Sequence, residues 1–487
     1  MGALTAFQPS ASRPWDRRLA AHLLNRTGFG GLPDHIDQAV KWGLEPTVDH
    51  LVDFEKIEES FPAPKLPDPI DREELRTMRD LPEQERQMKR QELFRSHREA
   101  IEEMRGWWIR RMLATKRPLQ EKLTLFWHGH FATSANDVKN SRHMFFQNEF
   151  LRKHCLGNFR DLVLGIARDP AMLEYLDNNT NRKQSPNENF ARELMELFTM
   201  GLGHYTEQDV QEAARAFTGW TFRPGSDDFL FIAHQHDSGS KEFLGQTGNF
   251  DGADVVDIIL KQPATAEFIG KKLFEFFVHE NPGPEVVTEI AATLRSHDYE
   301  LKPFLRQLFT SRLFYSAPAY RTQIKSPAQL AIGACRQLGM KINERALAVA
   351  MRGLGQDLLF PPNVKGWDVG EAWINTNTLL MRYNLAGFLL EGRLPGGPIA
   401  NKPGREQRAR RLLERAAPVH QLDQIVPAEM RTEPAPVVDL LVWRLLQTKL
   451  DAKAHAWLVE QATFVPAKER AVVVAHLIMS MPDYQLC

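Results

Sequence analysis

Acidic side chains recur at helical spacing between Ser185 and Gly201. Residues three and four apart lie on one face of a helix, so the polar side chains of this stretch form a stripe opposite the apolar ones. Carboxylates in such a stripe can bind a metal ion or transfer protons, and an arginine among them can orient an acid or bind an anionic substrate group. The alternative is a solvated ladder of ion pairs at i,i+4 spacing. The stripe consists of Glu188, Asn189, Arg192, Glu193 and Glu196.

The same stretch also predicts where its helix begins and ends. Ser185 is a favourable N-cap, and Pro186 suits the first helical position because it has no N–H to leave unpaired. Glu188 follows the cap by three residues, which completes a capping box. Gly201 suits the C-terminal end. We therefore predict one helix between Ser185 and Gly201.

Two histidines lie upstream in the segment Trp127-His-Gly-His-Phe131. In a continuous helix their rings would point about 200° apart, whereas in extended backbone they share one face. Gly129 favours a helix exit here, which would let both imidazoles converge. We therefore predict that His128 and His130, with Glu188 and Glu193, bind a divalent metal such as zinc, iron or manganese. The alternative is a purely structural pair, since the chain has no His-Glu-x-x-His motif.

A third group of polar residues follows at His236, Asp237 and Lys241. A carboxylate beside an imidazole can orient it and raise its basicity, so this group is a candidate for acid–base catalysis. The glycines around it are equally typical of a loop built from Asx turns. Both interpretations stay open at the level of the sequence.

Composition limits the possible partners and compartments. The 61 Lys and Arg residues balance 62 Asp and Glu residues, so no global field favours nucleic acid or an anionic membrane. Three widely spaced cysteines suggest neither a disulfide framework nor a zinc ribbon. No apolar run reaches the ~18 residues of a transmembrane helix. The N-terminal residues lack a signal-like apolar core, which predicts a cytoplasmic location, with the periplasm or cell envelope as the alternative.

Helical periodicity dominates the chain and predicts a mainly α fold: a large multi-helix body with one small β-hairpin region. We predict a main body at 1–391, a linker at 392–408 and a C-terminal helical segment at 409–487 that packs on the body. Within the body, 60–106 reads as a proline-rich spacer followed by a charged helical insert that projects outward. The β-like region is expected at 222–250.

Several short motifs occur in a fixed order along the chain. They include Leu24-Asn-Arg-Thr-Gly-Phe-Gly30, Phe126-Trp-His-Gly-His-Phe131, the Ser185–Leu197 stretch, Ala216-Phe-Thr-Gly-Trp220, Pro361-Pro-Asn363 and Gly366-Trp367. In order and type they closely resemble the uncharacterised bacterial family called domain of unknown function 1800. The resemblance implies a helical protein without an established activity. Members are often encoded beside a protein that resembles the alkaline phosphatase and sulfatase superfamily, which implies a shared pathway at the cell envelope.

Two functions follow from these observations. The first is a metal-dependent enzyme, hydrolytic or oxidative, with a site made of histidines and glutamates. The second is a non-catalytic partner or maturation factor for the phosphatase- or sulfatase-like neighbour. In that case the charged insert would be the docking surface and the acidic stripe a structural ladder.

Overall fold

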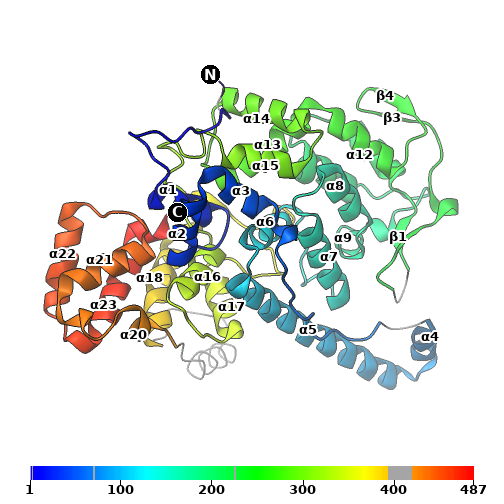
Figure 1. Ribbon diagram of the computed structural model, residues 1–487. Coiled ribbons are helices and arrows are strands. Elements are labelled where there is room, and N and C mark those ends of the chain that lie inside the picture. Colours follow the sequence, from blue (N-terminus) through cyan, green and yellow to red (C-terminus); the bar gives the residue numbers. More distant parts are fainter. Residues whose placement is uncertain (1, 3, 70–71, 224–225, 393–418) are drawn as a thin grey trace.

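Figure 1 shows the computed structural model, which describes residues 2, 4–69, 72–223, 226–392 and 419–487. Helices make up most of these residues, and the strands form two short antiparallel pairs. The predicted mainly α fold with a small β region is therefore confirmed. The predicted linker at 392–408 lies, apart from Gly392, outside the described residues. No helix in the described ranges combines the length and apolarity needed to cross a membrane.

Three short helices open the chain, and the first shows why the sequence folds this way. Asp16 caps it, because its carboxylate accepts the backbone N–H groups of Arg18 and Leu19, each at 3.0 Å. A proline at the first helical position starts the second helix. The three are α1 (Arg17–Arg26), α2 (Pro33–Trp42) and α3 (Leu44–Val52).

The charged insert is a helical hairpin of α4 (Arg72–Asp80) and α5 (Glu83–Ala114). The first part of α5 extends away from the body with α4 at its tip (Figure 1). From His97 onward α5 enters the protein, where Trp107 and Trp108 are buried. This one helix therefore joins an exposed arm to the hydrophobic core.

The central part of the chain packs helix upon helix around the acidic stretch. It begins with α6 (Pro118–His130), α7 (Ser141–His154), α8 (Phe159–Arg168), α9 (Pro170–Tyr175), α10 (Asn189–Glu193), the π-helix η3 (Leu194–Thr199) and α11 (Glu207–Ala216). It ends with α12 (Gly252–Lys261), α13 (Pro263–Phe277), α14 (Pro284–Ser296) and α15 (Leu301–Phe309).

Two hairpins lie between α11 and α12, close to the predicted β-like region. β1 (Trp220–Phe222) pairs with β2 (Phe229–Phe231), and β3 (Lys241–Phe243) pairs with β4 (Gln246–Gly248). In β3 the two end residues are buried and the middle one is exposed, as the two-residue period of a strand requires.

The remaining helices follow the central part. They are α16 (Pro327–Gln337), α17 (Glu344–Gly353), α18 (Thr376–Glu391), α20 (Leu422–Ile425), α21 (Pro434–Leu445), α22 (Ala452–Thr463) and α23 (Ala467–Met479). The last four, coloured orange to red in Figure 1, pack against one another and against α18. The proposed division into a main body and a C-terminal segment stays a prediction.

Two large hydrophobic clusters fill the protein, and α6 lies between them. One cluster is formed mainly by α6 and α8 to α15, and it contains Leu119, Leu123 and Trp127 of α6. The other is formed by α5 and the helices from α16 onward, and it contains Leu125 of α6. Opposite faces of α6 thus belong to different cores, which decides where its polar side chains point.

Candidate functional site

The acidic stretch is helical, but its helix begins later than we predicted. α10 starts at Asn189, whose backbone N–H donates to Oδ1 of Asn187 at 3.0 Å. The N–H of Asn187 in turn donates to Oδ1 of the buried Asn181 at 2.9 Å. Ser185 instead closes a turn, donating its N–H to the carbonyl of Arg182 at 2.9 Å. The predicted capping box is therefore wrong, because Asn181 fixes the entry to the helix, and Asn181 is itself anchored by donating to the Ala214 carbonyl of α11 at 2.9 Å.

The second half of the stretch is a π-helix, a form that often occurs at functional sites. Such a turn leaves main-chain carbonyls without hydrogen-bond donors in the helix. Here side chains from neighbouring helices contact these carbonyls. Lys272 donates its ammonium group to the carbonyl of Leu197 at 3.3 Å. The His130 ring lies 3.0 Å, through Nε2, from the carbonyl of Phe198. The π-turn is thus stabilised by side chains from α6 and α13.

The predicted ion-pair ladder is only half formed. Arg192 binds Glu188 at 3.1 Å, as predicted, but its other contacts go to Glu207 of α11 at 2.7 and 2.8 Å. Glu196 instead accepts a hydrogen bond from the hydroxyl of Tyr205 at 3.3 Å. A bidentate contact to a second helix displaces the local pair because two parallel hydrogen bonds hold the planar guanidinium.

Glu193 and Glu196 are half-buried neighbours on the π-helical side of the stripe. Burial raises the pKa of Glu193 above its ordinary value, and the charge of Glu196 raises it further. Arg192 and Lys365 act in the opposite direction. Burial, Glu196 and the hydrogen bond to Glu196 together raise the pKa of Tyr205 to about 12, so its hydroxyl stays protonated as a donor. These groups form the most chemically capable part of the stripe.

The sequence did not assign Lys365 or Tyr205 to this group. Lys365 belongs to the loop 361–367, whose motif residues carried part of the family resemblance, and that motif was the available signal. Tyr205 follows the glycine turn after the helix and offered no signal of its own. The ammonium group of Lys365 makes no hydrogen bond or ion pair with another described residue, so it is available to a negatively charged ligand.

The two histidines of α6 do not converge, which corrects our prediction of a helix exit at Gly129. α6 continues to His130, so the rings point to opposite cores. The close approach here depends on Gly366: a Cβ on that residue would lie 2.0 Å from the Gly129 carbonyl oxygen, whereas a Cβ on Gly129 would meet the Trp367 ring at 3.4 Å, an ordinary contact. Gly366 therefore allows the loop 361–367 to pack on α6.

His128 is enclosed between two tryptophans. Its ring centroid lies 5.4 Å from that of Trp108 and 5.5 Å from that of Trp367. Neither ring nitrogen has a hydrogen-bond partner among the described residues. Burial lowers the pKa of His128 to about 4, so the ring is neutral at pH 7.

His130 faces the other core and is engaged through both nitrogens. Besides Nε2 on the Phe198 carbonyl, its Nδ1 lies 3.4 Å from the ammonium group of Lys272. Since a carbonyl only accepts, Nε2 carries the proton and Nδ1 accepts from Lys272. Burial, followed by the charge of Lys272, holds the pKa of His130 well below its usual range. A metal ion on Nδ1 would have to displace Lys272.

The group at His236, Asp237 and Lys241 forms a loop in which the histidine and the carboxylate bind other partners, and its acid–base role stays a prediction. Nδ1 of His236 lies 2.9 Å from the carbonyl of Thr218, while the Asp237 carboxylate binds Arg215 at 2.8 and 3.2 Å. Lys241 is buried and donates to the carbonyls of Asp237 and Gly239. The hydrogen bond to Arg215 holds the pKa of Asp237 at about 2. Asp237 therefore orients the loop through Arg215 and makes no hydrogen bond to its histidine neighbour.

Within the described part of the chain, no three His, Cys, Asp or Glu side chains are grouped so that they could hold a metal ion. The predicted metal role of His128, His130, Glu188 and Glu193 therefore stays a prediction.

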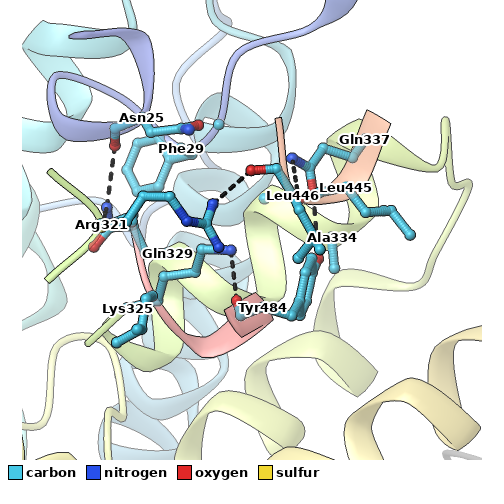
Figure 2. Close-up of a pocket in the computed structure, with 14 residues that line it drawn as sticks. Asn25, Phe29, Arg321, Lys325, Gln329, Ala334, Gln337, Leu445, Leu446 and Tyr484 are labelled. Carbon is cyan, nitrogen blue, oxygen red and sulfur yellow. Dashed lines mark hydrogen bonds between the residues drawn. The ribbon is translucent and has the colours of Figure 1, made fainter. Parts of the chain in front are cut away.

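A small cavity of about 10 Å³ lies where α1, α16 and the C-terminal residues meet (Figure 2). It has room for roughly one water molecule. Arg321 spans it by donating to the carbonyls of Leu446 and Asp483, and Gln329 donates to the carbonyl of Asn25. These side chains tie distant segments together, which is a structural role.

Comparison with known proteins gives one result. The family model described as "Protein of unknown function (DUF1800)" matches residues 22–486. No curated protein and no solved structure matches the chain. The match covers nearly the whole sequence, including α6, the acidic stretch and the loop 361–367. The chain therefore belongs to the DUF1800 family.

Proposed function

We propose that this protein is an acid–base enzyme of the hydrolytic class, with Glu193 as the proton donor and acceptor. A carboxyl group whose pKa is raised toward neutrality can hold a proton at working pH and return it during a reaction. Glu193 is the candidate for this role because burial and the charge of the neighbouring Glu196 both raise its pKa above the ordinary value. That single observation carries the proposal. Glutamates exchange protons and not electrons, which favours hydrolysis over oxidation.

The neighbouring residues have distinct roles in this proposal. Glu196, held by the Tyr205 hydroxyl, is the second carboxylate and would activate water. Lys365 would bind an anionic group of the substrate, a role that we first gave to Arg192. Arg192 is already occupied by Glu188 and Glu207 and would position the helix.

Substitution of the two carboxylates tests this function. We would assay p-nitrophenyl phosphate, sulfate, acetate and glycosides with the wild-type protein and with Glu193→Gln and Glu196→Gln. We expect both variants to lose at least ~100-fold in kcat, the usual size of a general acid–base contribution. Glu285→Gln, at an exposed position in the first turn of α14, is the matched control and should retain activity. Turnover that survives both substitutions would refute the proposal.

The pKa of Glu193 can be measured without substrate, so this second test does not depend on the choice of p-nitrophenyl substrates. Carbon-13 NMR of the glutamate carboxyls, assigned with Glu193→Gln, should show a Glu193 pKa above its ordinary value. Glu196→Gln should lower this pKa, because the neighbouring negative charge is removed. A Glu193 that titrates like an exposed glutamate would remove the basis of the proposed function.

The alternative role, as a partner of a phosphatase- or sulfatase-like protein, stays a prediction. Its docking surface would be the arm formed by α4 and α5, where Met88 and Phe94 are exposed.

A further inference from the structure

A second polar cavity lies where the arm enters the body. It has a volume of about 380 Å³, at the lower end of the range of small-molecule sites. Its walls come from α5, α7, α9 and the segment after β1. Two histidines and three carboxylates line it, together with Lys139, Arg142 and the rings of Phe94 and Phe222. None of these residues belongs to the acidic stripe.

His143 is the unusual member of this lining. Its side chain is only 4% exposed, and its Nδ1 has no hydrogen-bond partner among the described residues. The nearest anionic atoms are a carboxylate oxygen of Glu174, 3.5 Å from Nδ1, and one of Asp227, 3.9 Å from Nε2. A buried polar group without a partner costs about 1–3 kcal/mol. The protein therefore retains an imidazole that is ready to bind a group within the cavity.

His97 presents a defined donor to the same cavity. Its Nδ1 accepts the backbone N–H of Ser141 at 3.2 Å and lies 2.9 Å from the Ser141 hydroxyl. Because a backbone N–H can only donate, Nδ1 is unprotonated and Nε2 carries the hydrogen. Nε2 makes no hydrogen bond elsewhere in the described ranges. The tautomer of His97 is thus fixed by α7.

The cavity also offers acceptors without partners. Oδ1 of Asn179 accepts no hydrogen bond from another described residue. Glu174 has no lysine or arginine beside it and faces only Nδ1 of His143 at 3.5 Å, whereas Asp227 is neutralised by Arg142 through contacts of 2.6 and 3.0 Å. The unmatched groups therefore include both donors, such as His97 Nε2–H, and acceptors, such as Asn179 Oδ1 and Glu174.

We propose that this cavity binds a neutral, hydroxyl-rich ligand of monosaccharide size. A hydroxyl group both donates and accepts, so a ligand carrying several of them can satisfy the mixed set, whereas an anion could only accept. An anion would also meet Glu174 at close range. The Phe222 ring, in edge contact with His143 at 5.0 Å between centroids, gives an apolar wall for the C–H face of such a ligand.

Side-chain NMR of the full-length protein tests this assignment. In protein labelled with nitrogen-15 at histidine, the His97 and His143 ring signals, assigned with His97→Asn and His143→Asn, would be followed during titration. The probes are D-glucose, N-acetyl-D-glucosamine and myo-inositol, with inorganic phosphate as the anionic probe. We expect saturable shifts of both rings with at least one polyol and none with phosphate.

Two variants connect the shifts to the proposed contacts. Glu174→Gln and Asn179→Ala each remove one acceptor and should weaken binding by about tenfold. Glu285→Gln, on the distant helix α14, should bind like the wild type. The proposed ligand class is wrong if neither ring signal responds to any polyol up to the solubility limit of that polyol. It is also wrong if phosphate alone shifts the signals. An unchanged affinity in both variants would also overturn it.

Discussion

Removal of the charge on Glu121 should destabilise the protein strongly, because this carboxylate is fully buried between two arginines. Its oxygens accept hydrogen bonds from Arg111 at 2.8 Å, from Arg152 at 2.8 and 3.2 Å, and from the indole of Trp108 at 3.0 Å. Burial raises the pKa of Glu121, but the charges of Arg152 and Arg111 outweigh burial and keep the pKa below its ordinary value. The network joins α5, α6 and α7, the helices that position His128 and the second cavity.

The size of the effect follows from the contacts. Glu121→Gln keeps the shape but leaves two guanidinium groups without a buried counter-charge, and breaking a buried pair in this way costs about 3–5 kcal/mol. The matched control is Glu149→Gln: Glu149 also binds Arg152, but its side chain is 40% exposed, so we expect a loss of less than ~1 kcal/mol.

Urea unfolding followed by circular dichroism measures both variants. We expect a clear shift of the midpoint for Glu121→Gln, with the slope of the transition unchanged, and little shift for Glu149→Gln. Equal, small shifts of the unfolding midpoint for the two variants would show that water reaches Glu121. They would refute the assumption that Glu121, Arg111 and Arg152 are shielded from water.

Two further predictions concern α6 and the loop that packs on it. Gly366 has φ +87° and no room for a Cβ beside the Gly129 carbonyl. Gly366→Ala should therefore lower the free energy of unfolding, measured in urea, by about 2 kcal/mol or more. Gly283→Ala is the control and should change this free energy little, because a Cβ there meets nothing within 4 Å. His128 has a folded pKa of about 4 against 6.5 in the unfolded chain, so the unfolded state binds its proton first and stability falls as the pH drops below 6.5. Between pH 7 and pH 5 this amounts to roughly 2 kcal/mol, and His128→Leu should reduce the acid sensitivity by about that much; identical pH profiles would contradict the burial of a neutral ring.

The sequence predicted the helical architecture well because helical periodicity and caps are local properties. The stripe of Glu193 and Glu196 was found for the same reason. The start of the acidic helix was missed because the deciding hydrogen bond comes from Asn181, whose position depends on the packing of its own turn. Local capping rules favoured Ser185, but the hydrogen bond to Asn181, which is anchored on α11, overrode them.

The predicted convergence of His128 and His130 was wrong for a different reason. A glycine between two histidines is compatible with a helix exit and with a continuing helix, and the sequence does not distinguish them. In the structure α6 continues to His130, and the loop around Gly366, more than two hundred residues further along the chain, packs on it. The second cavity was missed altogether, since His143 and Glu174 occur in ordinary helical segments and become neighbours only when α7 packs on α9.

The contact between Gly129 and Gly366 explains why distant motifs meet at one place. It seats the loop 361–367 on α6, and the same loop carries Lys365, whose charge acts on Glu193. On its other face α6 places His130 against the π-turn that holds Glu196. One helix thus sets both the cation and the carboxylates of the proposed site. A buried, neutral His130 suits this role, because a charged ring would repel Lys272 and weaken its hydrogen bond to the carbonyl of Leu197 in the π-turn.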